Sequence, residues 1–344
     1  AAALDALDGH HARTAPPAAP PLPLHTRGRL RIPDGSLVAA RTRCPPRQQA
    51  PLSRPRPSPP QDCELSQRRE ERRAPFFHTS ALERRLPPVL DVCSSMVRER
   101  DWPNALSCHV NSSAAYTWDT TTKALGAHVL RVQDDSIITA VAISACGSFG
   151  FLGTARGAVE KFNLQSGHRR AATAAADAHS GSVRGLATEA LAQLLFSAGH
   201  DGELRVWRAR DLAAEWTLSL EAPVTLLRHQ RDTVLLAAAC DDLQVRVVDA
   251  VTRVLVRRFN GHRNTITDLA WTPDARWLVS CSLDGTMRIV DLPSAQLIGW
   301  YSFAFAPTSV AVSPGGEYFA TTHADVRAVC VWANRHVFSS VHFG

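Results

Sequence analysis

The stretch FNGHRNTITDLAWTPDARWLVSCSLDGTMRIVDLPSAQLIGWY, residues 259–301, has the pattern of four short strands separated by turns. Its runs at 266–271, 277–282, 286–291 and 296–301 are rich in residues that suit a half-buried pleated sheet. Pro273-Asp274, Asp284-Gly285 and Pro293-Ser294 mark the turns, and Asp284-Gly285 is the strongest hairpin signal among them. Four antiparallel strands in about 42 residues predict one blade of a β-propeller, which cannot bury its two faces alone.

The same pattern recurs along the chain. The position of Val290, just before Asp291, returns at Trp118, Phe162, Trp207, Val248 and Trp332, in steps of 44, 45, 41, 42 and 42 residues. Four repeats also place an acidic residue in the turn before an apolar run, in AGHDGELRVW (198–207), ACDDLQVRVVD (239–249), CSLDGTMRIVD (281–291) and THADVRAVCVW (322–332). This period is typical of WD40-type blades. We therefore expect an all-β, WD40-type β-propeller with about six visible blades, belonging to a seven-blade or tandem propeller.

Composition divides the chain into three parts. Residues 1–75 hold 14 of the 22 prolines and 13 arginines against 7 acidic residues, which accounts for the whole net charge of +6. We expect a disordered Pro/Arg-rich leader there, either a basic arm that touches RNA or, the favoured interpretation, a solvated segment without a ligand. Residues 76–100 are interpreted as a linker or blade-edge segment. Residues 101–344 are predicted to form the propeller, with five blades and a partial first one whose first strand is poorly marked.

Other features exclude several classes of protein. No run approaches the roughly 18 apolar residues of a membrane span, and no secretory signal is visible at residue 1. The eight cysteines are scattered without a C-x-x-C pair. This spacing favours reduced thiols in an intracellular compartment over a disulfide framework or a zinc site.

Polar residues recur at fixed places in the predicted blades. In WD40 blades a turn His, a strand Ser or Thr, a turn Asp and a Trp form a hydrogen-bonded tetrad. We expect a complete tetrad in the third blade and partial ones in the fifth, where Val290 removes the indole donor, and the sixth. The residues are His179, Ser197, Asp201 and Trp207 in the third blade, His262, Ser280 and Asp284 in the fifth, and Thr321, Asp325 and Trp332 in the sixth.

The same residue types form hydrolase triads, but two observations argue against catalysis. A nucleophile and its base are placed once, in a cleft, whereas these sets recur with the fold. The sequence also lacks a G-x-S-x-G elbow, a P-loop and an H-E-x-x-H motif. We therefore expect no enzyme activity, no cofactor, no metal ion and no small-molecule substrate.

Three arginines follow the turn acid of successive blades: Arg205, Arg246 and Arg288. Their shared position predicts that they lie near one rim of the propeller. They are candidates for RNA or partner contact, although solvated strand-edge arginines are the favoured interpretation.

Four segments carry a more specific resemblance than the blade pattern. They are RERDWPN…CHVNSSAAYTW within residues 97–118, VEKFNLQSGHRR (159–170), DARWLVSCSLDGTMRIVDLPSAQLI (274–298) and APTSVAVSPGGEYFATTHADVRAVCVWANRHVF (306–338). Over about residues 97–344 the chain resembles the WD-repeat U3 small nucleolar RNA-associated proteins of the small-subunit processome, subunits of its UTP-B subcomplex. Members of that family carry two tandem propellers and a C-terminal helical region, and this sequence is similar to the second propeller.

The resemblance implies a scaffold rather than an enzyme. It implies a nucleolar, hence nuclear, protein that assembles with other WD-repeat processome subunits and supports U3-dependent pre-rRNA processing to 18S rRNA. Its contact with pre-rRNA and the U3 ribonucleoprotein would be indirect, and it would have no membrane partner. The alternative is a WD40 adaptor of another complex, such as a ubiquitin-ligase substrate receptor or a signalling scaffold.

Overall fold

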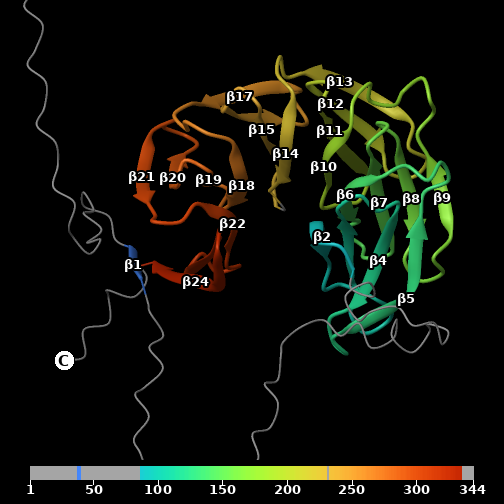
Figure 1. The fold of residues 1–344 in the computed structure, drawn as a ribbon. Coiled ribbons are helices and arrows are strands. Elements are labelled where there is room, and N and C mark those ends of the chain that lie inside the picture. Colours follow the sequence, from blue (N-terminus) through green and yellow to red (C-terminus); the bar gives the residue numbers. More distant parts are fainter. Residues whose placement is uncertain (1–36, 40–85, 231, 335–344) are drawn as a thin grey trace, which may run out of the picture. The chain divides into compact units, whose positions relative to one another are not determined.

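The computed structural model describes residues 37–39, 86–230 and 232–334, and every regular element in them is a β-strand. These strands form six four-stranded antiparallel sheets, the blades of a β-propeller (Figure 1). No helix in this described part is long and apolar enough to span a membrane.

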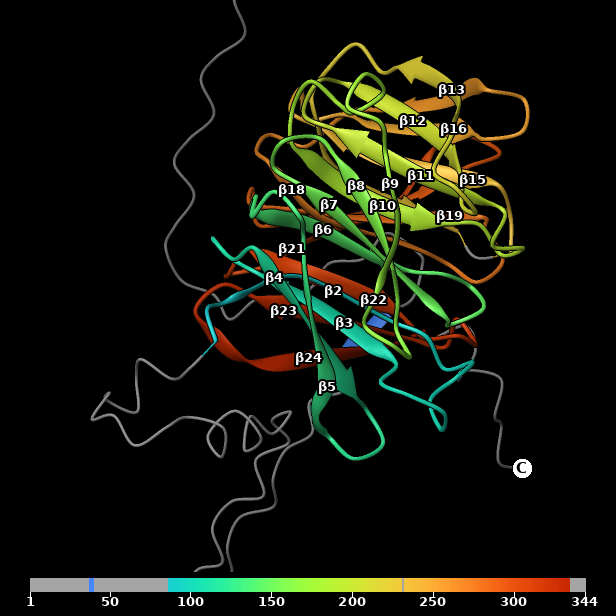
Figure 2. The same cartoon turned by 90° about the vertical axis from the view of Figure 1, so that its right-hand side faces the viewer.

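The first three blades follow one another in sequence. Blade 1 contains β2 (Val89–Ser94), β3 (Ala105–His109), β4 (Ala114–Asp119) and β5 (Ala124–Arg131). Blade 2 contains β6 (Ile138–Ile143), β7 (Phe149–Thr154), β8 (Val159–Asn163) and β9 (Arg169–Ala172). Blade 3 contains β10 (Val183–Thr188), β11 (Leu194–Gly199), β12 (Glu203–Arg208) and β13 (Ala214–Ser219), side by side in Figure 2.

The other three blades repeat this order, except in the last strand. Blade 4 contains β14 (Val224–His229), β15 (Leu235–Cys240), β16 (Val245–Asp249) and β17 (Val254–Phe259). Blade 5 contains β18 (Ile266–Trp271), β19 (Trp277–Ser282), β20 (Thr286–Asp291) and β21 (Leu297–Ser302). Blade 6 contains β22 (Pro307–Val312), β23 (Tyr318–His323), β24 (Val326–Asn334) and β1 (Leu37–Ala39).

Two strands differ from what the sequence indicates. The first strand of blade 1, poorly marked in the sequence, is β2 within residues 76–100. Residues 37–39, expected to be disordered, form β1, which pairs with β24 in the register Leu37↔Asn334 to Ala39↔Trp332. The pairing occurs because β24 would otherwise leave a row of unpaired backbone groups at the sheet edge. The rest of the leader lies outside the described residues.

The first strand of each blade contacts the first strand of the next, through the pairs β2–β6, β6–β10, β10–β14, β14–β18 and β18–β22. Each first strand also carries a β-bulge at its second residue, which bends it. Threonines at the bulge bond the neighbouring blade: Thr139 Oγ1 donates to the Val183 carbonyl at 2.5 Å. Likewise Thr267 Oγ1 donates to the Pro307 carbonyl at 2.8 Å. The bulges thus tie adjacent blades together by side-chain to backbone hydrogen bonds.

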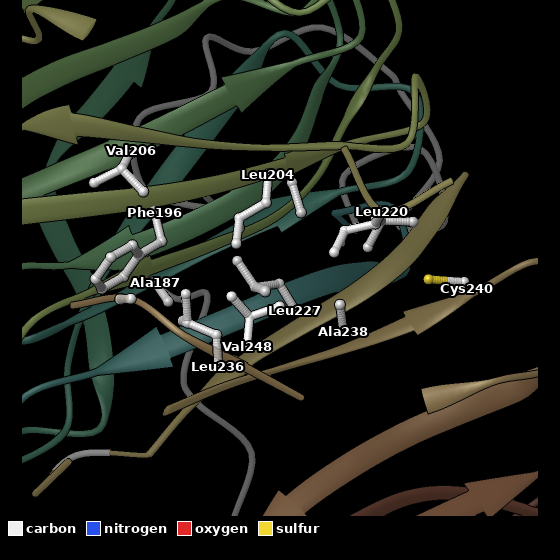
Figure 3. Packing of buried hydrophobic residues seen from close by; sticks show 13 residues of the cluster. Ala187, Phe196, Leu204, Val206, Leu220, Leu227, Leu236, Ala238, Cys240 and Val248 are labelled. Carbon is white, nitrogen blue, oxygen red and sulfur yellow. The ribbon is translucent and has the colours of Figure 1, made fainter. Parts of the chain in front are cut away.

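The hydrophobic core lies between the blades. Five clusters of buried side chains occupy the five successive blade interfaces, and Figure 3 shows the one between blades 3 and 4. On β11, Leu195 packs toward blade 2 whereas the next residue, Phe196, packs toward blade 4. Neighbouring residues of a strand point to opposite faces of the sheet, and here both faces are covered. The sequences of the central strands are therefore continuous apolar runs.

Candidate functional site

Blade 3 contains a complete polar tetrad. His179 Nδ1 lies 3.0 Å from Asp201 Oδ2, and its Nε2 lies 2.7 Å from Ser197 Oγ. Trp207 Nε1 donates to the same hydroxyl at 2.8 Å. Because a carboxylate only accepts hydrogen bonds, Nδ1 carries the imidazole proton and Nε2 accepts the Ser197 hydroxyl. All the polar atoms at the centre of this set are therefore satisfied within the blade.

The turn between β11 and β12 positions Asp201. Its carboxylate accepts the backbone N–H groups of Ser180 and Glu203 at 3.0 and 3.1 Å. A glycine is required at Gly199, since a Cβ there would lie 2.4 Å from Asp201 Oδ1 and 2.5 Å from His179 Nδ1. The segment AGHDG thus encodes both the turn and the space for the imidazole.

Blade 5 repeats this arrangement without the indole. His262 Nδ1 lies 3.2 Å from Asp284 Oδ2, and its Nε2 lies 2.8 Å from Ser280 Oγ. Asp284 also accepts from the Thr286 hydroxyl at 2.5 Å. Val290, at the position of Trp207, offers no donor, so Ser280 has one polar partner where Ser197 has two.

Blade 6 uses a different histidine. Trp332 Nε1 donates to Thr321 Oγ1 at 2.9 Å, and that oxygen lies 2.9 Å from Nε2 of His323, two residues further along β23. His323 Nδ1 bonds the Phe305 carbonyl at 3.1 Å. The sequence pattern places Asp325 in this set. In the structure the Phe305 carbonyl, not a carboxylate, bonds Nδ1 of the histidine, and Asp325 is a turn residue with φ of 60°. The structure therefore corrects the assignment of Asp325.

Blade 1 has the same variant, which the sequence pattern missed. Trp118 Nε1 donates to Ser107 Oγ at 2.8 Å, and that hydroxyl lies 3.0 Å from His109 Nε2. His109 Nδ1 bonds the Pro87 carbonyl at 2.6 Å. The signal was a Ser/Thr-x-His triplet with Trp eleven residues after the hydroxyl, present in both blades.

Burial sets the charge state of the tetrads. It lowers the pKa of His179 and of His262, despite the carboxylate beside each ring. Burial alone would raise the pKa of Asp284, but the Thr286 hydroxyl, backbone N–H groups and His262 hold it at about 2. Each set therefore pairs a neutral imidazole with a carboxylate near neutral pH.

The geometry of the blade 3 tetrad fits a structural role better than a catalytic or metal-binding one. Ser197 is fully buried, and both nitrogens of His179 are already bonded. His179, Asp201 and Glu203 place potential metal-ligand atoms within 4.8 Å of one another. However, Glu203 Oε2 pairs with Arg205 at 2.7 Å, so a metal ion would have to displace existing bonds at each ligand.

The three candidate arginines have different surroundings. Arg205 pairs with Glu203 and donates to the Ala178 carbonyl at 2.9 Å. Arg246 is only 3% exposed and forms a two-point ion pair with Asp242, at 3.0 and 2.6 Å. Arg288 is half-buried, and no described residue gives its guanidinium a hydrogen bond or an ion pair. The structure thus separates Arg288 from the other two.

A comparison with known proteins identifies the family of this chain. The family model described as the WDR36/Utp21 second beta-propeller domain matches residues 61–343. Human WD repeat-containing protein 36 is 36% identical over 261 residues, which are 75% of this chain and 29% of that protein. The U3 small nucleolar RNA-associated protein 21 homolog of Schizosaccharomyces pombe is 36% identical over 281 residues, 82% of this chain and 31% of the relative.

U3 small nucleolar RNA-associated protein 21 of Saccharomyces cerevisiae is 34% identical over 262 residues, which are 76% of this chain and 28% of that protein. The chain thus spans less than a third of the length of these relatives. A match over most of the chain to one domain model, together with this identity, assigns the propeller. The chain belongs to the WDR36/Utp21 family of WD-repeat proteins, in the region of its second β-propeller domain.

Proposed function

We propose that this chain is a non-enzymatic scaffold of the small-subunit processome, which supports U3 small nucleolar RNA-dependent processing of pre-rRNA to 18S rRNA in the nucleolus. The observation that carries the proposal is the match of residues 61–343 to the second propeller of a family named for its association with U3 small nucleolar RNA. Its partners would be other WD-repeat subunits of the processome.

The distribution of polar groups supports a scaffold. The His, Ser, Thr and Trp groups of four blades bond one another and hold the strands of their own blades in place. Five apolar clusters between blades then leave the loops and outer strands as the surfaces available to other molecules.

The arginines favour indirect contact with RNA. Arg205 and Arg246 are neutralised by carboxylates of their own blades, so they have little charge to offer a phosphate. Binding through protein subunits would bring this chain to the U3 ribonucleoprotein without a phosphate contact from Arg205 or Arg246.

A tagged pull-down of the whole chain from nuclear extract, with and without RNase, tests the proposal. Recovery of processome subunits that survives RNase supports the scaffold role. Recovery that disappears with RNase would place the contact on RNA, and a deletion of residues 1–36 would show whether the leader makes it. Recovery of ubiquitin-ligase or signalling subunits instead would overturn the proposal in favour of an adaptor.

A further inference from the structure

A cavity of about 150 Å³ lies in blade 5 on the side that faces blade 4. It is partly enclosed, and the walls mix apolar side chains with two members of the polar set of this blade. The residues that matter below are His262, Leu278, Ser280, Arg288, Val290 and Leu297.

The cavity occupies the place of a missing tryptophan. In blade 3, Trp207 pairs across the strands with Ala214, is fully buried and bonds Ser197. In blade 5 the equivalent pair is Val290 and Leu297. Leu297 does not replace the indole, since it is 50% exposed and the cavity remains beside Ser280.

Arg288 lies at the wall of this cavity and has no hydrogen-bond or ion-pair partner among the described residues. Its Nε is buried and makes no hydrogen bond to any described residue. The guanidinium lies against Gly261, where a Cβ would come within 1.9 Å of Nη1. Arg288 and Leu297 also line a second, more open cavity of about 430 Å³, together with Arg263, Asp284 and Trp300.

We propose that the blade 5 cavity binds an aromatic side chain of a protein partner, whose neighbouring carboxylate pairs with Arg288. A cavity of about 150 Å³ is large enough for a benzene-sized ring. Aromatic anchors in such pockets dominate the binding energy of many protein interfaces. A planar guanidinium with a free edge matches a carboxylate, which it binds through two parallel hydrogen bonds.

The surroundings favour a protein segment over RNA. Trp300 of β21, which lines the second cavity, is 61% exposed, so apolar area lies beside Arg288. Arg263 and Asp284 carry opposite charges on the wall of the neighbouring cavity, so the site lacks the run of unopposed cations that binds a phosphodiester backbone. A short peptide with an aromatic and an acidic residue in sequence would instead meet the apolar surface and the Arg288 guanidinium.

The test uses the whole chain and the blocked dipeptide N-acetyl-Phe-Asp-amide, with binding followed by NMR titration. The decisive variant is V290W/L297A, which gives blade 5 the side-chain pair of blade 3 and fills the cavity. We expect it to weaken dipeptide binding by about tenfold or more, whereas L297A alone, which keeps the cavity, retains binding. R288Q should also weaken binding, and R327Q, which removes an exposed arginine from blade 6, should not.

Matched probes separate the two parts of the site. N-acetyl-Ala-Asp-amide and N-acetyl-Phe-Asn-amide should each bind more weakly than the parent dipeptide. The proposal is overturned if V290W/L297A binds as the parent does, or if the alanine probe binds equally well. It is also overturned in favour of RNA if decauridylate binds more tightly than the dipeptide and is lost in V290W/L297A.

This proposal deepens the docking role proposed above, but the titration contains no processome subunit. Failure of the dipeptide to bind would therefore leave the pull-down result intact. A pull-down without processome subunits would in turn leave the pocket as the site of another partner.

Discussion

Arg228 of blade 4 donates from Nη2 to Oδ1 of Asp268 in blade 5, at 3.0 Å. The other carboxylate oxygen of Asp268 accepts the Ser309 hydroxyl at 2.6 Å and the Val310 N–H at 3.0 Å, both from blade 6. One carboxylate, only 5% exposed, therefore holds three successive blades. Asp91, at the equivalent bulge of blade 1, accepts the Val141 N–H of blade 2 at 3.1 Å.

This relationship predicts that D268N destabilises the propeller. The amide keeps the shape but loses the charge, and its NH2 group faces donors, so we expect a loss of about 1–3 kcal/mol in the free energy of unfolding. D268A should cost more, because it leaves a partly buried arginine and two donors without an acceptor. Urea denaturation measures both, with D274N as the control at an exposed turn. Equal stability of D268N and D274N would contradict the role of Asp268.

The tetrads predict a difference between two serines. S197A leaves both the His179 ring and the Trp207 indole without their shared partner, whereas S280A leaves only the His262 ring. We expect S197A to cost about 2–3 kcal/mol and S280A about half of that. Thermal and urea unfolding of the two variants measure this difference. A larger loss for S280A would show that the indole bond in blade 3 adds nothing.

The histidines predict a dependence of stability on pH. Burial lowers the pKa of His179 and His262 below the ordinary histidine value of about 6.5. The unfolded chain therefore takes up protons near that pH, while the folded chain does so only at lower pH. The free energy of unfolding should fall as the pH drops below about 6.5 and be fully retained above it.

Urea titrations between about pH 7.5 and 5 test this slope. The double variant H179N/H262N should be less stable at neutral pH but lose less on acidification. Identical slopes for the parent and the double variant would show that other groups govern the effect. The pKa of Asp284 is held at about 2, so this carboxylate stays ionised throughout this pH range.

The pairing of β1 with β24 predicts a boundary for truncation. Removal of residues 1–36 keeps β1, but removal of residues 1–40 exposes the backbone edge of β24. We expect the shorter truncation to be as stable as the parent and the longer one to be less stable and more prone to associate through that edge. Unfolding midpoints and light scattering compare the two. Equal behaviour would mean that the strand contributes nothing in solution.

The sequence by itself determined the blade pattern. A period of 41 to 45 residues, turn dipeptides such as Asp284-Gly285 and runs of strand-forming residues are local features, because strand and turn preferences depend on neighbouring residues. The spacing of His179, Ser197, Asp201 and Trp207 was readable for the same reason, since it repeats with the blade. The motifs at residues 159–170 and 274–298 also carried the resemblance to the family, and the match to the second propeller domain then showed that the chain belongs to it.

The tertiary structure decided the features that join distant residues. Nothing near Leu37 indicates that it pairs with Asn334, because an edge strand selects its partner by position in space. His323 takes the place of a turn histidine because its ring reaches Thr321 on one side and the Phe305 carbonyl on the other. The Arg288 Nε without a hydrogen bond among the described residues and the cavity beside Val290 also depend on which side chains are packed together. Packing of that kind cannot be predicted from a single sequence.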